Sequence, residues 1–196
     1  MSPHAIRLTS PLSDNCVAQL RAGAEVRITG TLYVARDAAH ERLVAALDAG
    51  QPIPFDPVGQ MIYYMGPSPP RPGYPIGSAG PTTSYRMDPY TETLLRAGIK
   101  GLIGKGERGE DVKRALQAHR AVYLIAVGGA GALIAQSIRQ AEVIAYPELG
   151  PEAIRRLQVT DFPAIVGCDI YGTDIYQIGR TPYRQVDLVK GRRKLC

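Results

Sequence analysis

Hydrophobic and polar positions along the chain predict strands and helices in alternation. Alternating or continuously apolar runs predict strands at 25–29, 31–35, 60–65, 101–104, 121–127, 142–145 and 164–170. Helix-favouring composition and apolar residues at helical spacing predict helices at 37–47, 110–119, 130–138 and 151–157. A further helix is predicted to start at the cap Thr82-Thr83 and to run through 90–97. Repeated alternation of helices with apolar strands predicts an α/β domain in layers, with a mixed, partly parallel sheet.

The two ends of the chain give weaker patterns. Residues 1–22 show no clear period, and one helical turn is expected after the cap pair Ser13-Asp14. Near the other end, 171–174 is expected to turn so that 175–178 pairs back on 164–170 as a hairpin. Residues 180–196 include the basic run Lys190–Lys194 and are expected to form an exposed tail. One domain spanning 1–196 suits the length.

A stretch rich in glycine and proline interrupts the pattern at 66–81. Five prolines precede Gly77, which excludes regular secondary structure. The stretch is either a linker or a loop held against another part of the chain. Apolar Ile76 and the aromatic Tyr74 favour the ordered loop.

Composition narrows the class of protein. Hydrophobic residues make up 45% of the 196 residues and charged residues 21%, which excludes a disordered chain, a collagen-like fibre and a coiled coil. The 21 glycines and 16 prolines predict many tight turns. The formal charge of +5 favours anionic small molecules, nucleic acid or an acidic partner.

The cysteines and the N-terminus suggest a compartment. The three cysteines, Cys16, Cys168 and Cys196, are far apart and form no CxxC or Cys/His pair, so no metal site within this chain is expected. Idle thiols suit a reducing cytosol. The N-terminus lacks a signal-peptide pattern and no apolar run is long enough to span a membrane, so we expect a soluble, cytoplasmic protein.

Two glycine-containing turns follow apolar strands. Residues 128–132 (Gly-Gly-Ala-Gly-Ala) lie where a dinucleotide-binding turn would lie, but Ile134 occupies the third glycine position, and tight helix packing needs the same small residues. Lys105 lies between Gly104 and Gly106 without the Ser or Thr of a P-loop. Lys105 is therefore either a surface lysine or one that points into a cleft.

Charged residues also gather at the junction of a strand and a helix, at Arg36, Asp37 and His40. Asp37 and His40 are three positions apart and share a helical face, so a hydrogen bond between them could orient the imidazole. The alternative is an ordinary helix start with an acid near its positive end. Arg36 lies where loops gather at the ends of strands.

A second cluster lies at 82–86. Thr82 and Thr83 at a helix start would offer hydroxyls and free amides to an anion. Arg86 lies one helical turn further on, on the same face as Thr82. A guanidinium binds a carboxylate with two parallel hydrogen bonds, which suits an organic acid. The alternative is a capping motif with a solvated arginine.

These motifs occur together, in a fixed order, in a known family. The stretches concerned are 30–40 (GTLYVARDAAH), 77–88 (GSAGPTTSYRMD), 104–106 (GKG), 128–130 (GGA) and 148–154 (ELGPEAI). Across about Gly23 to Ile178 the chain resembles the β subunit of class I fumarate hydratases. It equally resembles the C-terminal domain of single-chain class I fumarases, and both are related to the β subunit of L-tartrate dehydratase.

The resemblance implies a swivelling β/β/α domain that closes over an iron–sulfur centre. In the family, three cysteines of the α subunit hold an oxygen-sensitive [4Fe–4S] cluster, and one iron stays open for the substrate. This chain would hold no metal, and its partners would be a fumarase α subunit and a small dicarboxylate, with an α2β2 assembly and with neither nucleic acid nor a membrane. The implied reaction is the reversible hydration of fumarate to (S)-malate.

The resemblance also implies roles for individual residues. Arg36, Arg86 and Lys105 would bind the substrate carboxylates. Thr82 would lie beside the reacting carbon and take part in proton transfer, with Lys105 also at the catalytic centre. Asp37, His40 and Thr83 would support them.

Three alternatives remain open from the sequence. The 33–40 segment is more similar to the fumarase branch, but L-tartrate or mesaconate could be the substrate. The charge, the glycines at 128–131 and the basic tail leave a nucleotide- or nucleic-acid-binding module as a rival. A purely structural subunit, with the active site wholly in its partner, is the third.

Overall fold

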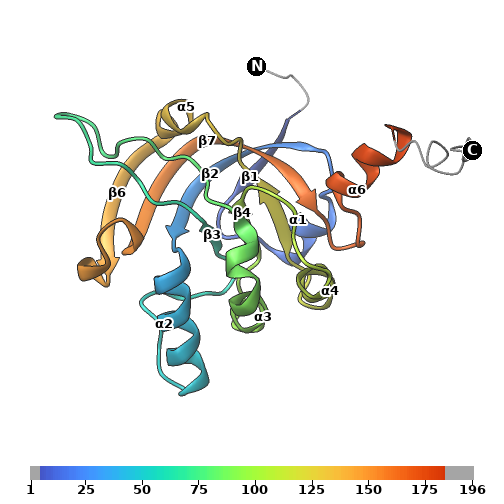
Figure 1. Cartoon of the computed structure of the whole chain (residues 1–196), viewed down its shortest axis with the longest axis horizontal. Helices are drawn as coiled ribbons and strands as arrows, with labels where there is room; N and C mark the ends of the chain where they lie inside the picture. Colours follow the sequence, from blue (N-terminus) through green and yellow to red (C-terminus); the bar gives the residue numbers. More distant parts are fainter. Residues whose placement is uncertain (1–4, 184–196) are drawn as a thin grey trace, which may run out of the picture.

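The computed structural model describes residues 5–183, which form a mixed sheet with helices packed against it (Figure 1). Its strands are β1 (Ile6–Thr9), β2 (Glu25–Val34), β3 (Met61–Tyr63), β4 (Gly101–Gly104), β5 (Val122–Ile125), β6 (Ile138–Ala145) and β7 (Ile154–Cys168). Its helices are α1 (Asp14–Ala18), α2 (Asp37–Asp48), α3 (Asp88–Arg96), α4 (Glu110–Ala118), α5 (Gly131–Ala135) and α6 (Ile175–Arg180). Short 3-10 segments cover Ser84–Met87, Pro147–Glu152 and Thr181–Tyr183.

The sheet is mixed and closes on itself. Strands β1 to β5 pair in sequence order, each parallel to the next. Strand β7 is antiparallel to β2, β5 and β6. Because β7 pairs with both β2 and β5, strands β2, β3, β4, β5 and β7 form a ring. The predicted α/β class with a partly parallel sheet is confirmed.

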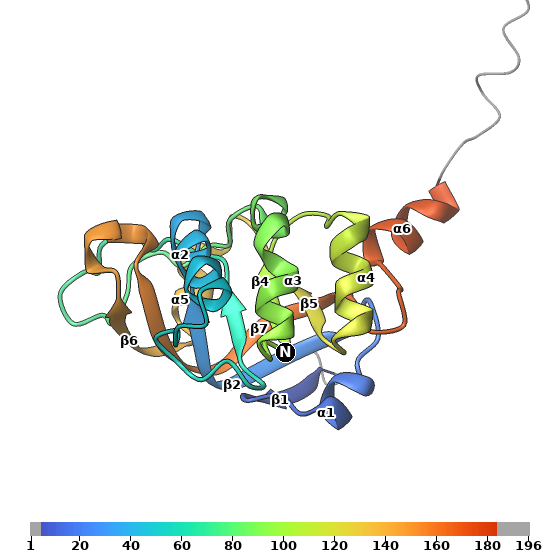
Figure 2. The ribbon, with the colours of Figure 1, turned by 90° about the horizontal axis from the view of Figure 1, so that it is seen from below.

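Successive residues of the central strands pack alternately into two hydrophobic cores. Met61 and Tyr63 of β3 join the cluster inside the ring, whereas Ile62 and the following Tyr64 join the cluster outside it. Helices α2, α3 and α4 lie side by side over that outer face (Figure 2). The strands are apolar on both faces because both faces are covered.

The two strands predicted at 25–29 and 31–35 are one strand, β2, with a bulge between Ile28 and Gly30. Gly30 has φ +115, and a Cβ there would lie 3.0 Å from the carbonyl oxygen of Ser10. Glycine therefore lets the strand bend past Ser10 without breaking. The unpatterned leading segment contributes β1 and, after the cap Ser13, the predicted helical turn.

Two predicted elements are wrong. The 151–157 helix is instead a 3-10 turn followed by the start of β7, because Ile154–Leu157 pairs with β2 on one side and β6 on the other. The 175–178 strand is the helix α6, because Asp174 caps it through a hydrogen bond from the Tyr176 amide. In both places the tertiary partners of the segment decided its conformation.

The boundaries of two other elements differ from those predicted. Helix α5 ends at Ala135, and β6 begins at Ile138 rather than at residue 142. Of the expected tail, Arg180–Tyr183 is exposed and partly helical, and the basic run at 190–194 lies outside the described residues. No helix in the described range 5–183 is long and apolar enough to cross a membrane.

The 66–81 stretch is a loop held at its base rather than a linker. Met65 and Pro81 form an antiparallel bridge, and the Tyr63 hydroxyl donates to the Ala79 carbonyl at 2.5 Å. Ile76 and Ala79 are buried in the inner core. Because Pro81 is fixed beside Met65, the next residue, Thr82, lies at the end of the sheet.

Candidate functional site

The predicted site residues gather at one end of the parallel strands. Arg36 follows β2, Lys105 follows β4 and Gly128 follows β5, and these strands run in the same direction. The carboxyl ends of parallel strands are where open α/β sheets bind their ligands. Residues 92 positions apart in the sequence, from 36 to 128, thus share one edge of the sheet.

The 82–86 segment is attached to the same edge through its backbone. The Thr82 amide donates to the Tyr64 carbonyl at 2.8 Å, and the Ser84 amide donates to the Lys105 carbonyl at 2.9 Å. Thr83 forms a parallel bridge with Lys105 and caps the 3-10 turn without a side-chain hydrogen bond. The Thr82 amide is therefore not free for an anion, and neither is the Ser84 amide.

Arg36 and Arg86 converge on the carboxylate of Asp37. The Nη2 atom of Arg86 lies 2.7 Å from Oδ2 of Asp37, and Nη2 of Arg36 lies 3.8 Å from the same oxygen. Arg86 Nη2 also donates to Oγ1 of Thr82 at 3.3 Å, as the spacing of the two residues predicts. Arg36, Asp37, Thr82 and Arg86 thus form one contiguous polar cluster.

Glu152 completes this cluster and was missed in the sequence. Its Oε1 lies 3.2 Å from Nη2 of Arg36, and its Oε2 accepts from the Ala38 amide at 3.1 Å. Glu152 lies within the 148–154 motif, but it is 116 positions from Arg36. No local spacing could have paired them, and the only available signal was membership of the motif.

The two guanidiniums have unused donors. The Nε atoms of Arg36 and Arg86 are buried, yet neither has a hydrogen-bond partner within residues 5–183. The side chains themselves are 23% and 37% exposed. A buried donor without an acceptor is costly, so this cluster is suited to receive the oxygens of an anionic ligand.

His40 supports Arg36 rather than contacting Asp37. Its ring is fully buried, and Nδ1 lies 2.8 Å from the Arg36 carbonyl, which can only accept, so Nδ1 carries the proton. Burial lowers the pKa of His40 to about 4, so the ring is neutral near pH 7. The expected Asp37–His40 hydrogen bond is wrong, because Asp37 turns outward to Arg86 while His40 turns back to the start of α2.

Lys105 extends across Gly128. A Cβ on Gly128 would lie 3.4 Å from Cδ and 3.8 Å from Nζ of Lys105. Within the described residues, Lys105 has no side-chain hydrogen bond or ion pair. The Lys105 side chain thus lies beside Gly128 at the end of β5, and in the described part of the chain no hydrogen bond or ion pair joins it to the cluster around Asp37.

Gly131 serves close packing at this edge. A Cβ on Gly131 would lie 2.8 Å from the Gly80 nitrogen and would clash with Oγ of Ser78, and the Ala79 amide donates to the Gly131 carbonyl at 3.0 Å. Only glycine allows α5 to approach the base of the 66–81 loop this closely. Close packing therefore explains the glycine at position 131.

The described cysteines are not arranged as metal ligands. Cys168 is buried, and burial raises the pKa of its thiol to about 12; burial also raises the pKa of the half-buried Cys16. No group of three His, Cys, Asp or Glu side chains between residues 5 and 183 could hold a metal ion. Cys196 lies outside the described residues.

Fold and site together define a domain that presents cations at the ends of parallel strands. The family model described as Fumarase C-terminus matches residues 2–179, and the chain belongs to this family. It is 42% identical over 163 residues to the anaerobic class I fumarate hydratase of Escherichia coli K12, and 40% identical over 162 residues to fumarate hydratase 2 of Leishmania major. These relatives are named as fumarate hydratases, which are hydro-lyases.

The matches cover the two kinds of relative very differently. Each of the two fumarate hydratase alignments covers 82% of this chain, but only 30% and 28% of the respective relative. A protein of Methanocaldococcus jannaschii, provisionally named as the beta subunit of L(+)-tartrate dehydratase, is 33% identical over 187 residues. That match covers 92% of this chain and 96% of the relative. The chain thus spans under a third of the fumarate hydratases but nearly all of a subunit.

Proposed function

We propose that the chain is the β subunit of a hydro-lyase that hydrates fumarate reversibly to (S)-malate. The observation that carries the proposal is the pair of guanidiniums on Asp37, each with a buried Nε that finds no acceptor among residues 5–183. Membership of the Fumarase C-terminus family supports the reaction class. A dicarboxylate would supply the acceptors that the cluster lacks.

Arg36, Arg86 and Lys105 bind the substrate in this proposal. Each guanidinium can present Nε and an Nη atom side by side to one carboxylate. Lys105, directed across Gly128, adds a point charge at the same edge. Removing the proton next to a carboxylate places extra negative charge on that carboxylate, so fixed cations stabilise the transition state more than the ground state.

Thr82 is the proposed proton-transfer residue. Its Oγ1 accepts from Arg86, so its own hydroxyl proton stays available for another partner. A threonine hydroxyl is a weak base, but the adjacent guanidinium favours its deprotonated form. An acid from the partner subunit would complete the proton path.

We propose that the [4Fe–4S] cluster belongs to a fumarase α subunit in an α2β2 assembly. The described part of this chain brings together no ligand set for it, so its residues here only bind, orient and transfer protons. The near-complete overlap with a β subunit supports a separate partner chain. The same overlap favours L-tartrate as a second candidate substrate, and mesaconate is a third.

Reconstitution tests the proposal. The purified chain should be colourless and inactive, and it should gain dicarboxylate-dependent hydratase activity when combined anaerobically with a class I fumarase α subunit. The panel should contain fumarate, L-tartrate and mesaconate, so that the substrate is identified in the same assay. Hydratase activity from the chain alone would contradict the division into subunits.

Lys105→Ala in the reconstituted complex separates a catalytic from a purely structural subunit. We expect a loss of about 100-fold in kcat/KM, on the scale of removing a group that stabilises the transition state. Arg114→Ala is the control, because its side chain is 70% exposed on α4. Unchanged activity of Lys105→Ala would place the active site wholly in the partner subunit. Salt-sensitive binding of DNA or RNA by a complex without hydratase activity would instead favour a nucleic-acid-binding module.

A further inference from the structure

The backbone around Lys105 is held by hydrogen bonds on every side. Its amide donates to the Thr82 carbonyl at 3.3 Å, and its carbonyl accepts from the Ser84 amide at 2.9 Å. The next residue, Gly106, has φ +87, a conformation that few residues other than glycine adopt. The direction of Lys105 therefore depends on what fixes Gly106.

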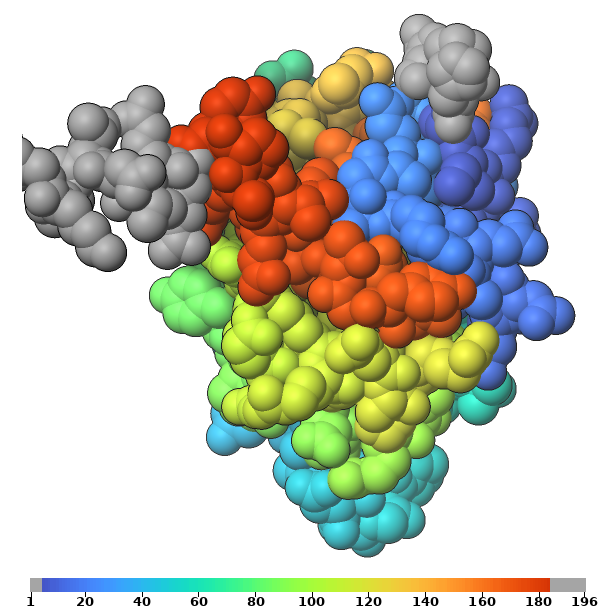
Figure 3. All heavy atoms as spheres, turned by 90° about the vertical axis from the view of Figure 1, so that its right-hand side faces the viewer, coloured from blue at the N-terminus to red at the C-terminus, as the bar shows by residue number. Residues whose placement is uncertain are grey.

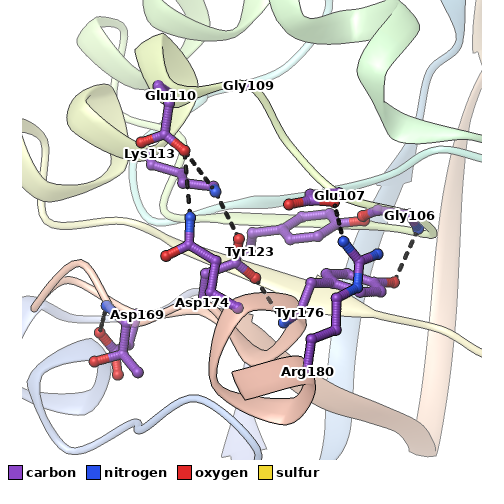
Figure 4. A network of polar contacts seen from close by, with 12 residues as sticks. Gly106, Glu107, Gly109, Glu110, Lys113, Tyr123, Asp169, Asp174, Tyr176 and Arg180 are labelled. Atoms are coloured by element: carbon purple, nitrogen blue, oxygen red, sulfur yellow. Dashed lines mark hydrogen bonds and ion pairs between the residues drawn. The ribbon is translucent and has the colours of Figure 1, made fainter. Parts of the chain in front are cut away.

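Two tyrosines contact Gly106 from different elements (Figure 4). The Gly106 amide donates to Oη of Tyr176 on α6 at 3.2 Å. The Gly106 carbonyl accepts from Oη of Tyr123 on β5 at 2.8 Å. Both peptide units of Gly106 are thus tied to phenol groups.

The proton positions around Tyr123 follow from its partners. A carbonyl can only accept, so the single hydroxyl proton of Tyr123 points to Gly106. The Ser84 hydroxyl, 2.9 Å from Tyr123 Oη, must then donate to it. Burial raises the pKa of Tyr123, so the phenol keeps its proton at neutral pH. A directed chain of hydrogen bonds therefore joins the 82–86 segment to the peptide after Lys105.

Helix α6 holds Tyr176 in place independently of Gly106. Asp174 caps the helix through the Tyr176 amide at 2.9 Å, and its other oxygen lies 2.6 Å from Nζ of Lys113 on α4. At the other end of the helix, Arg180 pairs with Glu107 at 3.2 Å. In the space-filling view, the segment after β7 lies across the surface between the N-terminal residues and the region of α4 and β5 (Figure 3).

We propose that Tyr123 and Tyr176 are positioning residues that hold the Gly106 peptides and thereby direct the Lys105 ammonium into the substrate site. This inference rests on the proposed function and deepens it, because it gives α6 a part in the reaction. Neither tyrosine touches the substrate. Without them, Gly106 could turn its flanking peptides, and Lys105 would lose its fixed direction.

Amide hydrogen exchange on the full chain tests the hydrogen bonds that hold Gly106, and it needs no measurement of enzyme activity. In Tyr176→Phe the Gly106 amide loses its acceptor, and we expect its exchange to accelerate about tenfold. Tyr171→Phe is the matched control, since its hydroxyl lies in the same C-terminal segment but donates to the Ala18 carbonyl. Unchanged Gly106 exchange in Tyr176→Phe, or equal acceleration in both variants, would overturn the inference.

A double-mutant cycle in the complete enzyme tests the part played in the reaction. Tyr176→Phe should lower kcat/KM about tenfold when Lys105 is present, and at most about twofold in a Lys105→Met background. Tyr123→Phe should behave in the same way. Equal losses in both backgrounds would show a merely structural role and overturn the inference.

The two experiments separate failure of the inference from failure of the proposed function. If the wild-type complex hydrates none of the dicarboxylates, the proposed function fails and the role in catalysis falls with it, whatever the exchange result. If the wild-type complex is active but the exchange of Gly106 does not respond, only the inference fails.

Discussion

Two arginine clusters lie near the same edge of the sheet and differ in how completely they are satisfied. Arg108 is 0% exposed, and its Nε and Nη2 donate to Asp88 and Thr91 at 2.7 and 2.8 Å. Its guanidinium also lies 5.5 and 5.1 Å from the ring centres of Tyr64 and Tyr123. Arg36 and Arg86 are partly exposed and share one carboxylate oxygen, and in the described part of the chain both of their Nε atoms are without partners.

The difference separates an arginine that builds the fold from the two arginines that we propose bind the substrate. Arg108 has an acceptor or an aromatic face for each part of its guanidinium, so it ties α3 to the outer face of the sheet. Asp37 and Glu152 orient Arg36 and Arg86 without saturating them. Burial and charge alone would rank Arg108 first as a site residue, whereas our proposal chooses Arg36 and Arg86 for their unsatisfied donors.

Removal of Arg108 should have the largest effect, and the effect should be on stability. We expect Arg108→Ala to lower the free energy of unfolding by about 3–5 kcal/mol, because Asp88 and Thr91 lose a buried partner. Urea denaturation of the full chain measures this, with the exposed Arg114→Ala as the control. A loss below about 1 kcal/mol would place Arg108 among ordinary surface ion pairs.

The free energy of unfolding of the chain should fall in acid because of His40, which like Arg108 lies beside Tyr64. Its ring lies edge-on to Tyr64 and near Tyr90, and its pKa is about 4 in the folded chain against an ordinary value near 6.5. Between these two values the unfolded chain binds the extra proton, so stability falls as the pH drops from 6.5 to 4, by about 3 kcal/mol in total.

His40→Gln isolates this contribution, because the variant cannot titrate there. The wild-type free energy of unfolding minus that of the variant should decrease as pH falls through this window and stay constant above it. A difference that does not change with pH would mean that His40 titrates alike in the folded and unfolded chains.

In the unsatisfied cluster, Arg86→Ala should affect activity and leave the fold intact. We expect kcat/KM of the reconstituted complex to fall about 100-fold, which is about 2.7 kcal/mol of transition-state stabilisation. The free energy of unfolding should change by less than about 1 kcal/mol, because the side chain is 37% exposed. Near-normal kcat/KM would show that Arg86 is not part of the active site, and the proposed functional difference between Arg86 and Arg108 would be wrong.

The smallest expected effect is that of Asp37→Asn, which keeps the shape but removes the shared charge. The contact with Arg86 loses its charge and becomes a weaker hydrogen bond to an amide oxygen, so Arg86 is oriented less firmly and KM should rise about tenfold with a smaller change in kcat. Steady-state kinetics on the complex measure this split. A lower KM would instead mean that Asp37 competes with the substrate carboxylate.

The predicted elements succeeded where the pattern is local. The apolar strands at 101–104 and 121–127 and the helix starting at Asp37 all form close to the expected bounds. The segments at 151–157 and 175–178 failed, because pairing with β2 and β6 and capping by Asp174 outweighed the local propensity.

The candidate site shows the same division. The contact between Thr82 and Arg86 follows from a spacing of four, and the structure has it at 3.3 Å. The Asp37–His40 contact also had helical spacing but does not form, because both side chains find better partners elsewhere. Glu152 and Tyr176 were missed since each reaches its partner across 70 or more positions of sequence.

The sequence by itself determined the α/β class, the family motifs and the residue types at the site, because periodicity, turn residues and short spacings act between neighbours. Only the tertiary structure decided that β7 closes the sheet, that Asp37 lies between two arginines and that two tyrosines hold Gly106. Those outcomes depend on which distant groups can satisfy one another's hydrogen bonds once the strands are paired. That choice is made by packing, and no local pattern encodes it.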